Sequence, residues 1–391
     1  MGYQNGAGAF LHPASVARAY GAVDPCSRRC RRSLFAECRW VCRLMSTDKN
    51  GLRYPWADPP TEGAAIEVAD GVLWFRMPLP MVLDHVNIYA LADEDGWTIV
   101  DTGFNSKRCR AIWEKLLVGP LAGRPVRRVL ITHHHPDHVG LAGWLQARTG
   151  ATLMATRTAW LMARMLCLDV QPCLAPETLR FWRRAGMDPA IFAKRAAERP
   201  FNFADVVWPI PLGFQRIKQD DVLHLAGRDW VVHIGNGHAP EHATLWSQSD
   251  DLVLAGDQVL SSISPNIGVY ATEPDADPVG DWLEACNRLA GLANEAHVVL
   301  GGHKMPFTGL PLRMRQLIDN HHGALARLSA ALDQPKTATE CFMALFKRKI
   351  GDGEYGLALV ESYAHLSHLY QQGHLSRDLR DDGAYVYGRL G

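Results

Sequence analysis

The order of apolar and polar positions predicts alternating strands and helices from residue 64 onward. Apolar runs that end in Gly, Asp or a polar turn predict strands over 64–75, 86–91, 97–103, 126–132 and 151–155. A second group of strands is predicted over 222–225, 229–234, 243–247, 251–254 and 297–300. Apolar residues spaced three and four apart predict helices over 107–117, 139–147 and 282–293. Hairpin-like and crossover connections are mixed, so we expect α/β layers built on a mixed sheet.

Two segments depart from this rhythm. Residues 156–199 have a helical pattern in which Trp, Met and Phe are interleaved with Arg, and they predict a helical insertion that forms either a packed side layer or a lid. Residues 310–391 carry helical patterns only, over 310–332, 338–349 and 356–372. We therefore expect a main domain over 45–309 and a small helical C-terminal domain over 310–391.

The composition is that of a globular protein. Of the 391 residues, 47% are hydrophobic and 21% are charged, which excludes a chain that is disordered throughout and a coiled coil. Lys plus Arg and Asp plus Glu each number 41, so no overall field attracts nucleic acid or an anionic membrane. No apolar run approaches the roughly 18–20 residues that a membrane helix needs. We expect a protein without a membrane partner, and the oligomeric state leaves no signal.

Residues 1–44 differ from the rest of the chain. They hold seven Arg and two acidic residues, and no charged region precedes an apolar one, so they are not a secretory signal. Met45 opens a segment that reads like an ordinary protein start. We expect residues 1–44 to be a disordered or non-native extension, with a transit peptide as the alternative. A chain of this size does not need disulfides to fold, so we expect free thiols and a cytoplasmic location.

The 17 histidines carry the chemical signal. Residues 132–138 read Thr-His-His-His-Pro-Asp-His and follow a predicted buried strand. His133 and His135 project to the same side of an extended loop, whereas Asp137 and His138 lie where the next helix starts. One loop can therefore supply ligands to two metal ions. Neutral imidazole and carboxylate suit zinc, and also manganese or iron.

Three later strands end in the same way. Each apolar run is followed by a short Gly-containing turn and then by a potential ligand: His238, Asp257 and His303. Strand ends are rigid, and Gly lets the backbone approach closely. One shared site explains these features better than a solvated His-rich loop and three unrelated coincidences.

With these residues, the sequence resembles the metallo-β-lactamase superfamily. His133-x-His135-x-Asp137-His138 matches the H-x-H-x-D-H motif of that family, and Val100-Asp101-Thr-Gly103 matches its D-T-G segment. The later single ligands follow in the family's order, and the resemblance spans roughly residues 66–307. It implies an αββα sandwich with two divalent metal ions, most readily Zn²⁺, at the strand ends between two sheets.

The resemblance also implies a role for each position. One metal would be held by His133, His135 and His238, and the second by Asp137, His138 and His303. Asp257 would bridge both, together with a water or hydroxide. Asp101 would orient a ligand imidazole, with a turn or helix cap as the alternative, and His242 would be a supporting or a structural residue. Asp137 and Asp257 are the expected catalytic residues.

The implied reaction is hydrolysis of a small molecule by a hydroxide between two cations. The acid at position 257 and His138 look like the dinuclear thioesterase and phosphodiesterase branches, and argue against β-lactam hydrolysis. The complete ligand set argues against the persulfide-oxidising branch, which uses one iron. The prediction is a hydrolase of a small ester, thioester or lactone, similar to hydroxyacylglutathione hydrolase (glyoxalase II-like). The apolar insertion over 156–199 favours it, although no C-terminal basic cluster matches that enzyme's glutathione contacts.

Two alternatives stay open. The first is a phosphodiesterase or RNA nuclease, because some relatives with a small helical C-terminal domain cut RNA. One predicted C-terminal helix carries charged or titratable side chains that form either a phosphate track or a solvated face: Arg313, Arg315, His321, His322 and Arg327. The second alternative is a non-catalytic metal-binding protein. Ser264 has no base beside it in the sequence, so no covalent mechanism is expected.

Overall fold

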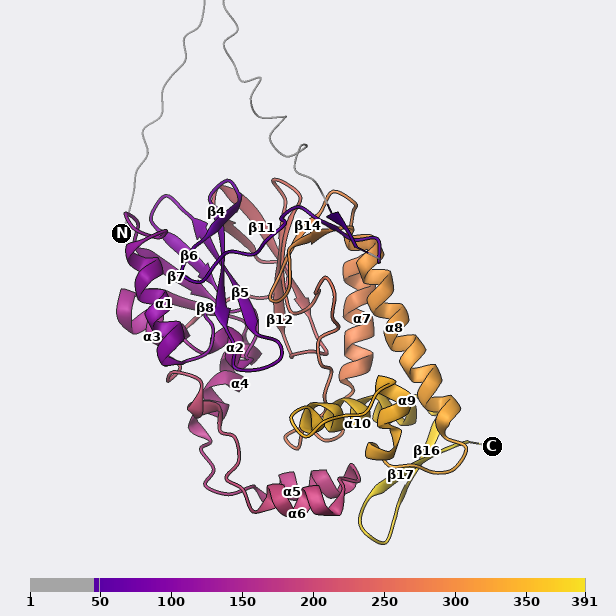
Figure 1. The fold of residues 1–391 in the computed structure, drawn as a ribbon. Helices are drawn as coiled ribbons and strands as arrows, with labels where there is room; N and C mark the ends of the chain where they lie inside the picture. Colours follow the sequence, from indigo (N-terminus) through magenta and orange to yellow (C-terminus); the bar gives the residue numbers. More distant parts are fainter. Residues whose placement is uncertain (1–45, 49, 391) are drawn as a thin grey trace, which may run out of the picture. The chain divides into compact units, whose positions relative to one another are not determined.

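Two β-sheets lie face to face at the centre of the molecule (Figure 1). The computed structural model describes residues 46–48 and 50–390, and the predicted extension over 1–44 lies outside this range. The first sheet has the order β3 (Ile66–Ala69), β4 (Val72–Pro78), β5 (His85–Ala92), β6 (Trp97–Val100), β7 (Val126–Leu130), β8 (Thr152–Ala155), β9 (Gln215–Arg216). The second has the order β1 (Ser46–Thr47), β2 (Arg53–Tyr54), β15 (Phe307–Thr308), β14 (Val298–Gly301), β13 (Leu252–Gly256), β12 (His242–Ser247), β11 (Arg228–Gly235), β10 (Val222–Leu225).

Helices cover the outer face of each sheet. The first sheet packs against α1 (Lys107–Val118) and α3 (Ala142–Thr149) through one hydrophobic cluster. The second packs against α7 (Pro278–Ala290) and α8 (Leu310–Ala331) through another. A third cluster, which includes Trp74, Leu130, Trp230 and Leu300, fills the space between the two sheets. The predicted αββα sandwich is therefore confirmed.

Each sheet contains parallel strands whose carboxyl ends reach the same edge. In the first sheet β6 and β7 are parallel, and in the second β13 and β14 are parallel. Parallel strands deliver the residues that follow them to one edge of a sheet, which is where α/β proteins place ligand sites. The segments after these four strands contain Asp101, the loop 132–138, Asp257 and His303.

The insertion contains three helices, as its pattern predicts: α4 (Arg157–Leu168), α5 (Pro176–Arg184) and α6 (Pro189–Ala196). The short α2 (Pro136–Val139) belongs to the histidine loop that follows β7. The α5 segment joins a hydrophobic core with the C-terminal helices, and the ring centroids of Phe181 and Tyr363 are 5.0 Å apart. This part of the insertion is a packed layer.

The C-terminal region contains α8, α9 (Phe342–Phe346) and α10 (Tyr355–Gln371), with a 3-10 turn at Thr339–Cys341 before α9. Another 3-10 turn, Phe203–Asp205, follows the insertion. The expectation of helices alone over 310–391 is wrong, because β16 (Leu375–Leu379) and β17 (Tyr385–Arg389) form an antiparallel hairpin. The turn between them contains Asp382-Gly383, a signal that favours hairpins. None of the described helices is long and apolar enough to cross a membrane.

Two further predictions from the sequence concern the segment 64–75 and the boundary between the two domains. The strand predicted over 64–75 is a hairpin of β3 and β4, and Gly71 adopts a φ of +70° at its turn. All described residues belong to one compact unit, in which the C-terminal helices share a core with the second sheet. The division between residues 309 and 310 stays a prediction.

Candidate metal centre

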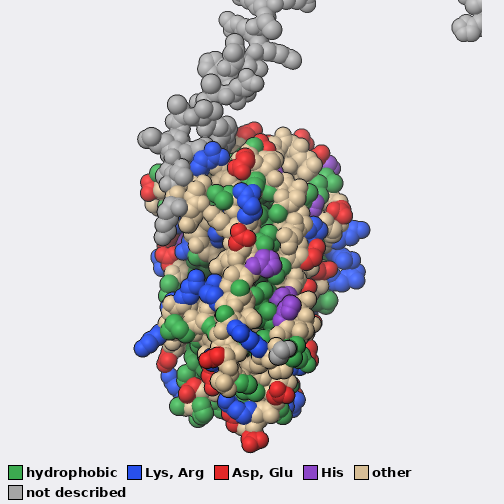
Figure 2. Space-filling view, turned by 90° about the vertical axis from the view of Figure 1, so that its right-hand side faces the viewer, with side chains coloured by type: hydrophobic (Ala, Val, Ile, Leu, Met, Phe, Trp, Pro, Cys, Tyr) green, Lys and Arg blue, Asp and Glu red, His purple; other side chains and the backbone are tan. Residues whose placement is uncertain are grey.

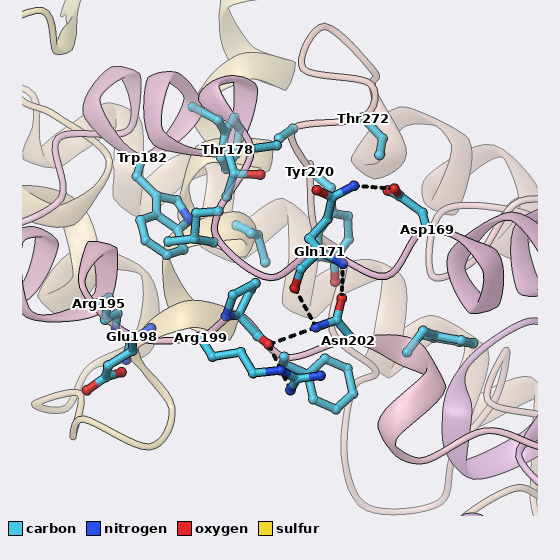
Figure 3. Close-up of a pocket in the computed structure, with 18 of the residues that line it drawn as sticks. Asp169, Gln171, Thr178, Trp182, Arg195, Glu198, Arg199, Asn202, Tyr270 and Thr272 are labelled. Carbon is cyan, nitrogen blue, oxygen red and sulfur yellow. Dashed lines mark hydrogen bonds between the residues drawn. The ribbon is translucent and has the colours of Figure 1, made fainter.

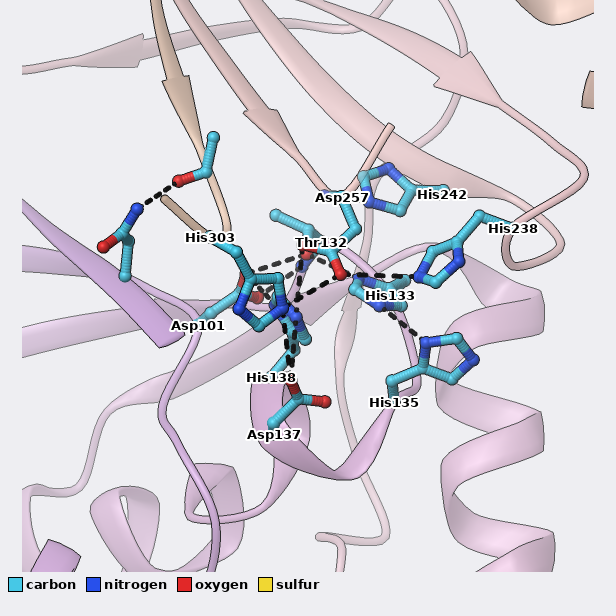
Figure 4. A network of polar contacts seen from close by, with 12 residues as sticks. Asp101, Thr132, His133, His135, Asp137, His138, His238, His242, Asp257 and His303 are labelled. Atoms are coloured by element: carbon cyan, nitrogen blue, oxygen red, sulfur yellow. Dashed lines mark hydrogen bonds and ion pairs between the residues drawn. The ribbon is translucent and has the colours of Figure 1, made fainter. Parts of the chain in front are cut away.

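The structure brings all seven predicted ligands to one point at the edge between the sheets (Figure 4). They form three overlapping groups whose ligand atoms lie within 4.8 Å of one another. The groups are His133 with His135 and His238, His133 with His138 and Asp257, and Asp137 with His138 and His303. Each ligand follows an apolar strand, so the rigid sheet edges determine the position of the cluster.

The Asp257 carboxylate lies at the middle of this cluster. Its Oδ1 is 3.5 Å from His138 Nε2. Its Oδ2 is 3.5 Å from His238 Nε2 and 3.1 Å from His303 Nε2. On the far side, Asp137 Oδ2 is 3.3 Å from His303 Nε2. Asp257 therefore faces both the His238 side and the His303 side of the cluster.

Three buried atoms test whether these residues fit a cation. His138 Nε2, His238 Nε2 and Asp257 Oδ1 have no hydrogen-bond partner among the described residues. A buried polar atom without a partner costs about 1–3 kcal/mol, so three of them at one point indicate a missing group. Imidazole nitrogen and carboxylate oxygen are the ligands of Zn²⁺ and similar ions. The residues therefore fit divalent cations.

The other ring nitrogen of two ligands is held by a backbone carbonyl. His238 Nδ1 donates to the carbonyl oxygen of Asn266 at 2.8 Å, and His303 Nδ1 donates to that of His85 at 2.7 Å. Because a carbonyl oxygen only accepts, each Nδ1 carries a proton and each Nε2 is the ring nitrogen that faces the cluster. Such partners fix the tautomer and the orientation of a metal-binding imidazole.

Asp101 connects the ends of β6 and β7 at the centre. Its Oδ2 accepts from His138 Nδ1 at 2.8 Å and from the Thr132 hydroxyl at 2.8 Å. Its Oδ1 accepts the backbone N–H of Thr132 at 2.8 Å. Asp101 adopts a φ of +63°, a conformation that Asp tolerates better than most residues. The carboxylate thus orients His138 and anchors the start of the histidine loop.

Replacement of Asp101 by Asn is expected to weaken zinc binding about 10- to 100-fold. One amide oxygen cannot accept from all three of the donors that now meet the carboxylate, so the orientation of His138 is lost. Competition with a chromophoric chelator measures the change in affinity. Asp95→Asn is the matched control, because Asp95 is an exposed partner of Arg128 in the turn before β6. Unchanged zinc affinity in Asp101→Asn would contradict this role.

The charges within the cluster favour opposite protonation states on its two sides. Burial and the neighbouring imidazoles lower the pKa of His133 and His135 well below the usual value. Although burial opposes a charged ring, the carboxylates of Asp257 and Asp137 raise the pKa of His303 to about 10. The same carboxylates, with Asp101, raise the pKa of His138 well above its usual value. Without a cation, His138 and His303 therefore hold protons at neutral pH.

Zinc binding is accordingly expected to release protons and to tighten as the pH rises from 6 to 8. A protonated imidazole cannot bind a metal, so each displaced proton contributes about tenfold in apparent affinity per pH unit. Titration calorimetry in two buffers of different ionisation enthalpy counts the protons released. Proton-neutral binding with an affinity independent of pH would show that the metal displaces no proton from His138 or His303.

His242 and His134 lie beside the cluster but outside the candidate groups. His242 Nε2 accepts the backbone N–H of Asp257 at 3.0 Å, and its ring stacks on His133 at 4.6 Å. Burial lowers the pKa of His242 to about 3, so the ring stays neutral and able to accept. It holds the end of β13, which positions Asp257. His134 is buried as well.

No pattern in the sequence signals the contacts that hold the loop after β13. Asn266 of this loop donates from Nδ2 to Glu361 of α10 at 2.7 Å, while its carbonyl holds His238. Ser264 has no base beside it in the sequence. In the structure, however, its Oγ lies 3.2 Å from His321 Nε2. Between 57 and 95 residues separate these partners along the chain, so no local pattern could have paired them.

The helix α8 turns two of its predicted charged positions inward. Arg313 is buried and donates to the carbonyl oxygens of Leu260 at 2.6 Å and Ile263 at 2.7 Å. His321 is also buried, against Ser264. These two side chains hold the loop after β13 and belong neither to a solvated face nor to a phosphate track.

The fold and the site together define a metal-binding αββα sandwich. A family model described as the Metallo-beta-lactamase superfamily matches residues 81–303. A second, described as Metallo-beta-lactamase-like, C-terminal domain, matches residues 325–390. The chain belongs to the metallo-beta-lactamase superfamily, which confirms the resemblance of its motifs. Membership and the candidate metal-ligand groups together support a metal-dependent hydrolase.

Solved structures and a curated protein resemble most of the chain. A beta-lactamase domain protein from Burkholderia ambifaria is 37% identical, with a TM-score of 0.80, over 87% of this chain and 98% of that one. A metallo-beta-lactamase family protein from Thermus thermophilus is 28% identical, with a TM-score of 0.70, over 83% of this chain and 100% of that one. A probable metallo-hydrolase, YqjP, from Bacillus subtilis is 24% identical over 307 residues, 76% of this chain and 91% of that protein.

Proposed function

We propose that the protein is a dinuclear metal-dependent hydrolase that cleaves a small ester, thioester or lactone. The observation that carries the proposal is the position of the Asp257 carboxylate between the two groups of ligands. Its Oδ1 faces His138 and its Oδ2 faces His238 and His303, so one carboxylate is shared by two groups of ligands. A shared carboxylate between two sets of three ligands is suited to a pair of cations, as in two-metal hydrolases.

The seven candidate ligands can be assigned to two ions. One ion would be held by His133, His135 and His238, and the other by Asp137, His138 and His303, with Asp257 contacting both. Two divalent cations, Zn²⁺ first and manganese or iron next, supply a nucleophilic water near neutral pH and a Lewis acid when bound.

Asp137 is suited to proton transfer at this site. Its side chain is partly exposed at the mouth of the cluster, at 17% of its free surface. Although burial opposes it, the neighbouring His138 and His303 lower the pKa of Asp137, which keeps the carboxylate ionised. An ionised carboxylate in this place can accept a proton and pass it to the leaving group.

The charges of the C-terminal region favour a carbonyl substrate over a phosphodiester. Arg313 and His321, two of the residues that suggested a phosphate track, are buried. Figure 2, which views the molecule from the side of α8, shows cationic and anionic side chains interspersed over the surface. A phosphate backbone is usually bound by a continuous cationic surface, and this face does not present one.

Hydrolysis assays on zinc-loaded protein test the proposal. We expect turnover of a chromogenic acyl thioester or ester and little turnover of bis(p-nitrophenyl) phosphate, with Asp137→Ala protein purified in parallel as a control for contaminants. Turnover of the phosphodiester alone would overturn the substrate class and favour a phosphodiesterase. Failure on thioesters, esters, lactones and phosphodiesters with both cations bound would favour a non-catalytic metal-binding protein.

A further inference from the structure

A cavity of about 760 Å³ lies between the insertion and the C-terminal helix α10 (Figure 3). Its walls come from the end of α4, from α5 and α6, from residues 199–203, from the loop 270–272, and from Val360 of α10. The volume falls within the roughly 300–1,000 Å³ that is typical of sites for small molecules. None of the seven metal-ligand residues lines it, so it is a separate feature of the fold.

Five aromatic side chains contribute to the lining of this cavity. The aromatic residues that line it are Phe181, Trp182, Phe201, Phe203 and Tyr270. Phe201 is 66% exposed and Tyr270 is 47% exposed, although both carry large apolar rings. Large apolar rings that stay in contact with water around a concave surface are typical of ligand sites.

Several polar residues of the wall already have hydrogen-bond partners within the protein. Arg199 makes two hydrogen bonds to Asp205, at 2.8 and 2.9 Å. Asn202 exchanges hydrogen bonds with the backbone of Gln171, at 2.7 and 2.9 Å. Arg195 donates to the carbonyl oxygen of Asp352 at 2.8 Å. These contacts occupy several of the polar groups of the wall, and the aromatic rings offer apolar surface to a ligand.

The cavity also carries no excess charge. Its cationic residues are Lys194, Arg195 and Arg199, and its acidic residues are Asp169, Glu198 and Asp352. Equal numbers of opposite charges give no net attraction for an anionic or a cationic ligand. The lining therefore fits an uncharged apolar group.

Two segments that build the cavity make hydrogen bonds to the loop that contains the metal ligand His238. Tyr270 lies four residues after Asn266, whose carbonyl accepts from His238 Nδ1. Four residues span at most about 14 Å, so a short stretch of chain joins this wall to the residue that orients His238. On the other side, the hydroxyl of Thr156, which caps α4, donates to the carbonyl oxygen of Glu241, between His238 and His242 in the chain.

We propose that this cavity binds the apolar alkyl or aryl group of the substrate, the part that does not react. The proposal rests on the proposed hydrolase function for the bond that is cleaved, and it adds the substrate class: neutral acyl compounds with a medium-length chain or a ring. Burial of that group against the aromatic wall holds the reacting carbonyl of the same molecule near the metal-ligand cluster.

Hydrolysis of acyl esters of two lengths tests the assignment. Phe201→Ala is expected to lower kcat/KM for a p-nitrophenyl octanoate about tenfold and to leave that for the acetate within twofold, because only the longer chain reaches the aromatic wall. Trp182→Ala should act in the same direction. Leu212→Ala is the matched control, since Leu212 is 78% exposed and lies outside the cavity lining. Phe201 is exposed, so its replacement leaves the core intact, which thermal unfolding verifies.

Binding of 1-octanol provides a readout that needs no turnover. Titration calorimetry on the full chain is expected to show that 1-octanol binds the wild type. The affinity of Phe201→Ala for 1-octanol should be at least fivefold lower. If no ester, thioester or lactone is cleaved but octanol binding depends on Phe201, the hydrolase proposal fails and the cavity still binds an apolar group. If esters are cleaved but neither the octanoate-to-acetate ratio nor the octanol affinity changes in Phe201→Ala and Trp182→Ala, the cavity assignment is overturned.

Discussion

Replacement of Asp257 by Ala is expected to lower kcat/KM for a chromogenic thioester by at least about 1,000-fold, equivalent to roughly 4 kcal/mol of transition-state stabilisation. The carboxylate is the one group that contacts His138, His238 and His303 together among the described residues. Without it, three buried imidazoles face one another with less anionic charge to balance a cation. Metal content should fall together with activity.

The fold of the Asp257→Ala variant is expected to persist, because the backbone N–H at this position still donates to His242. Circular dichroism and thermal unfolding verify it, and mass spectrometry gives the metal content. Asp251→Ala is the matched control, since Asp251 is an exposed acid in the turn that precedes the same strand. The control should retain activity within twofold. An Asp257→Ala protein with wild-type metal content and activity would remove the basis of the proposed function.

Replacement of Asp137 by Ala is expected to nearly abolish turnover while leaving the fold intact, with a loss of at least about 100-fold in kcat. Asp137 Oδ2 lies 3.3 Å from His303 Nε2 and 3.6 Å from His138 Nε2, so its removal weakens one side of the cluster and deletes the proposed proton carrier. The side chain is partly exposed, so no buried cavity results.

Comparison of Asp137→Ala with Asp137→Asn separates the two roles of this residue. The amide keeps an oxygen for a cation but carries no proton between water and leaving group at neutral pH. We expect Asp137→Asn to retain more bound zinc than Asp137→Ala and to remain slow, as measured by metal analysis and steady-state kinetics. Wild-type turnover in Asp137→Ala would show that the metal on this side is not catalytic.

The residues that the sequence predicted best are those whose position depends on a local pattern. His238, Asp257 and His303 each follow an apolar strand and a Gly-containing turn, and the structure places all three at one edge of the sandwich. A buried strand can be recognised from its own residues, and its end is rigid. The cluster could therefore be anticipated before any distance was known.

The residues that the sequence did not predict depend on contacts between distant segments. Asn266 contacts both His238 and Glu361, and no spacing links a loop in the second sheet with a helix 95 residues later. Arg313 looked like a surface charge on α8 until its contacts with the loop after β13 were known. The hairpin of β16 and β17 lies in a region whose apolar pattern predicts helices alone, and only the Asp382-Gly383 turn signals it.

The metal content of the full chain tests the central claim most directly. The protein is saturated with zinc, freed of excess by gel filtration, and analysed by inductively coupled plasma mass spectrometry against its concentration. We predict close to two equivalents per chain, because Asp257 faces ligands of both proposed sets of three. A chain that retains no zinc, or one equivalent with full hydrolytic activity, would contradict the account.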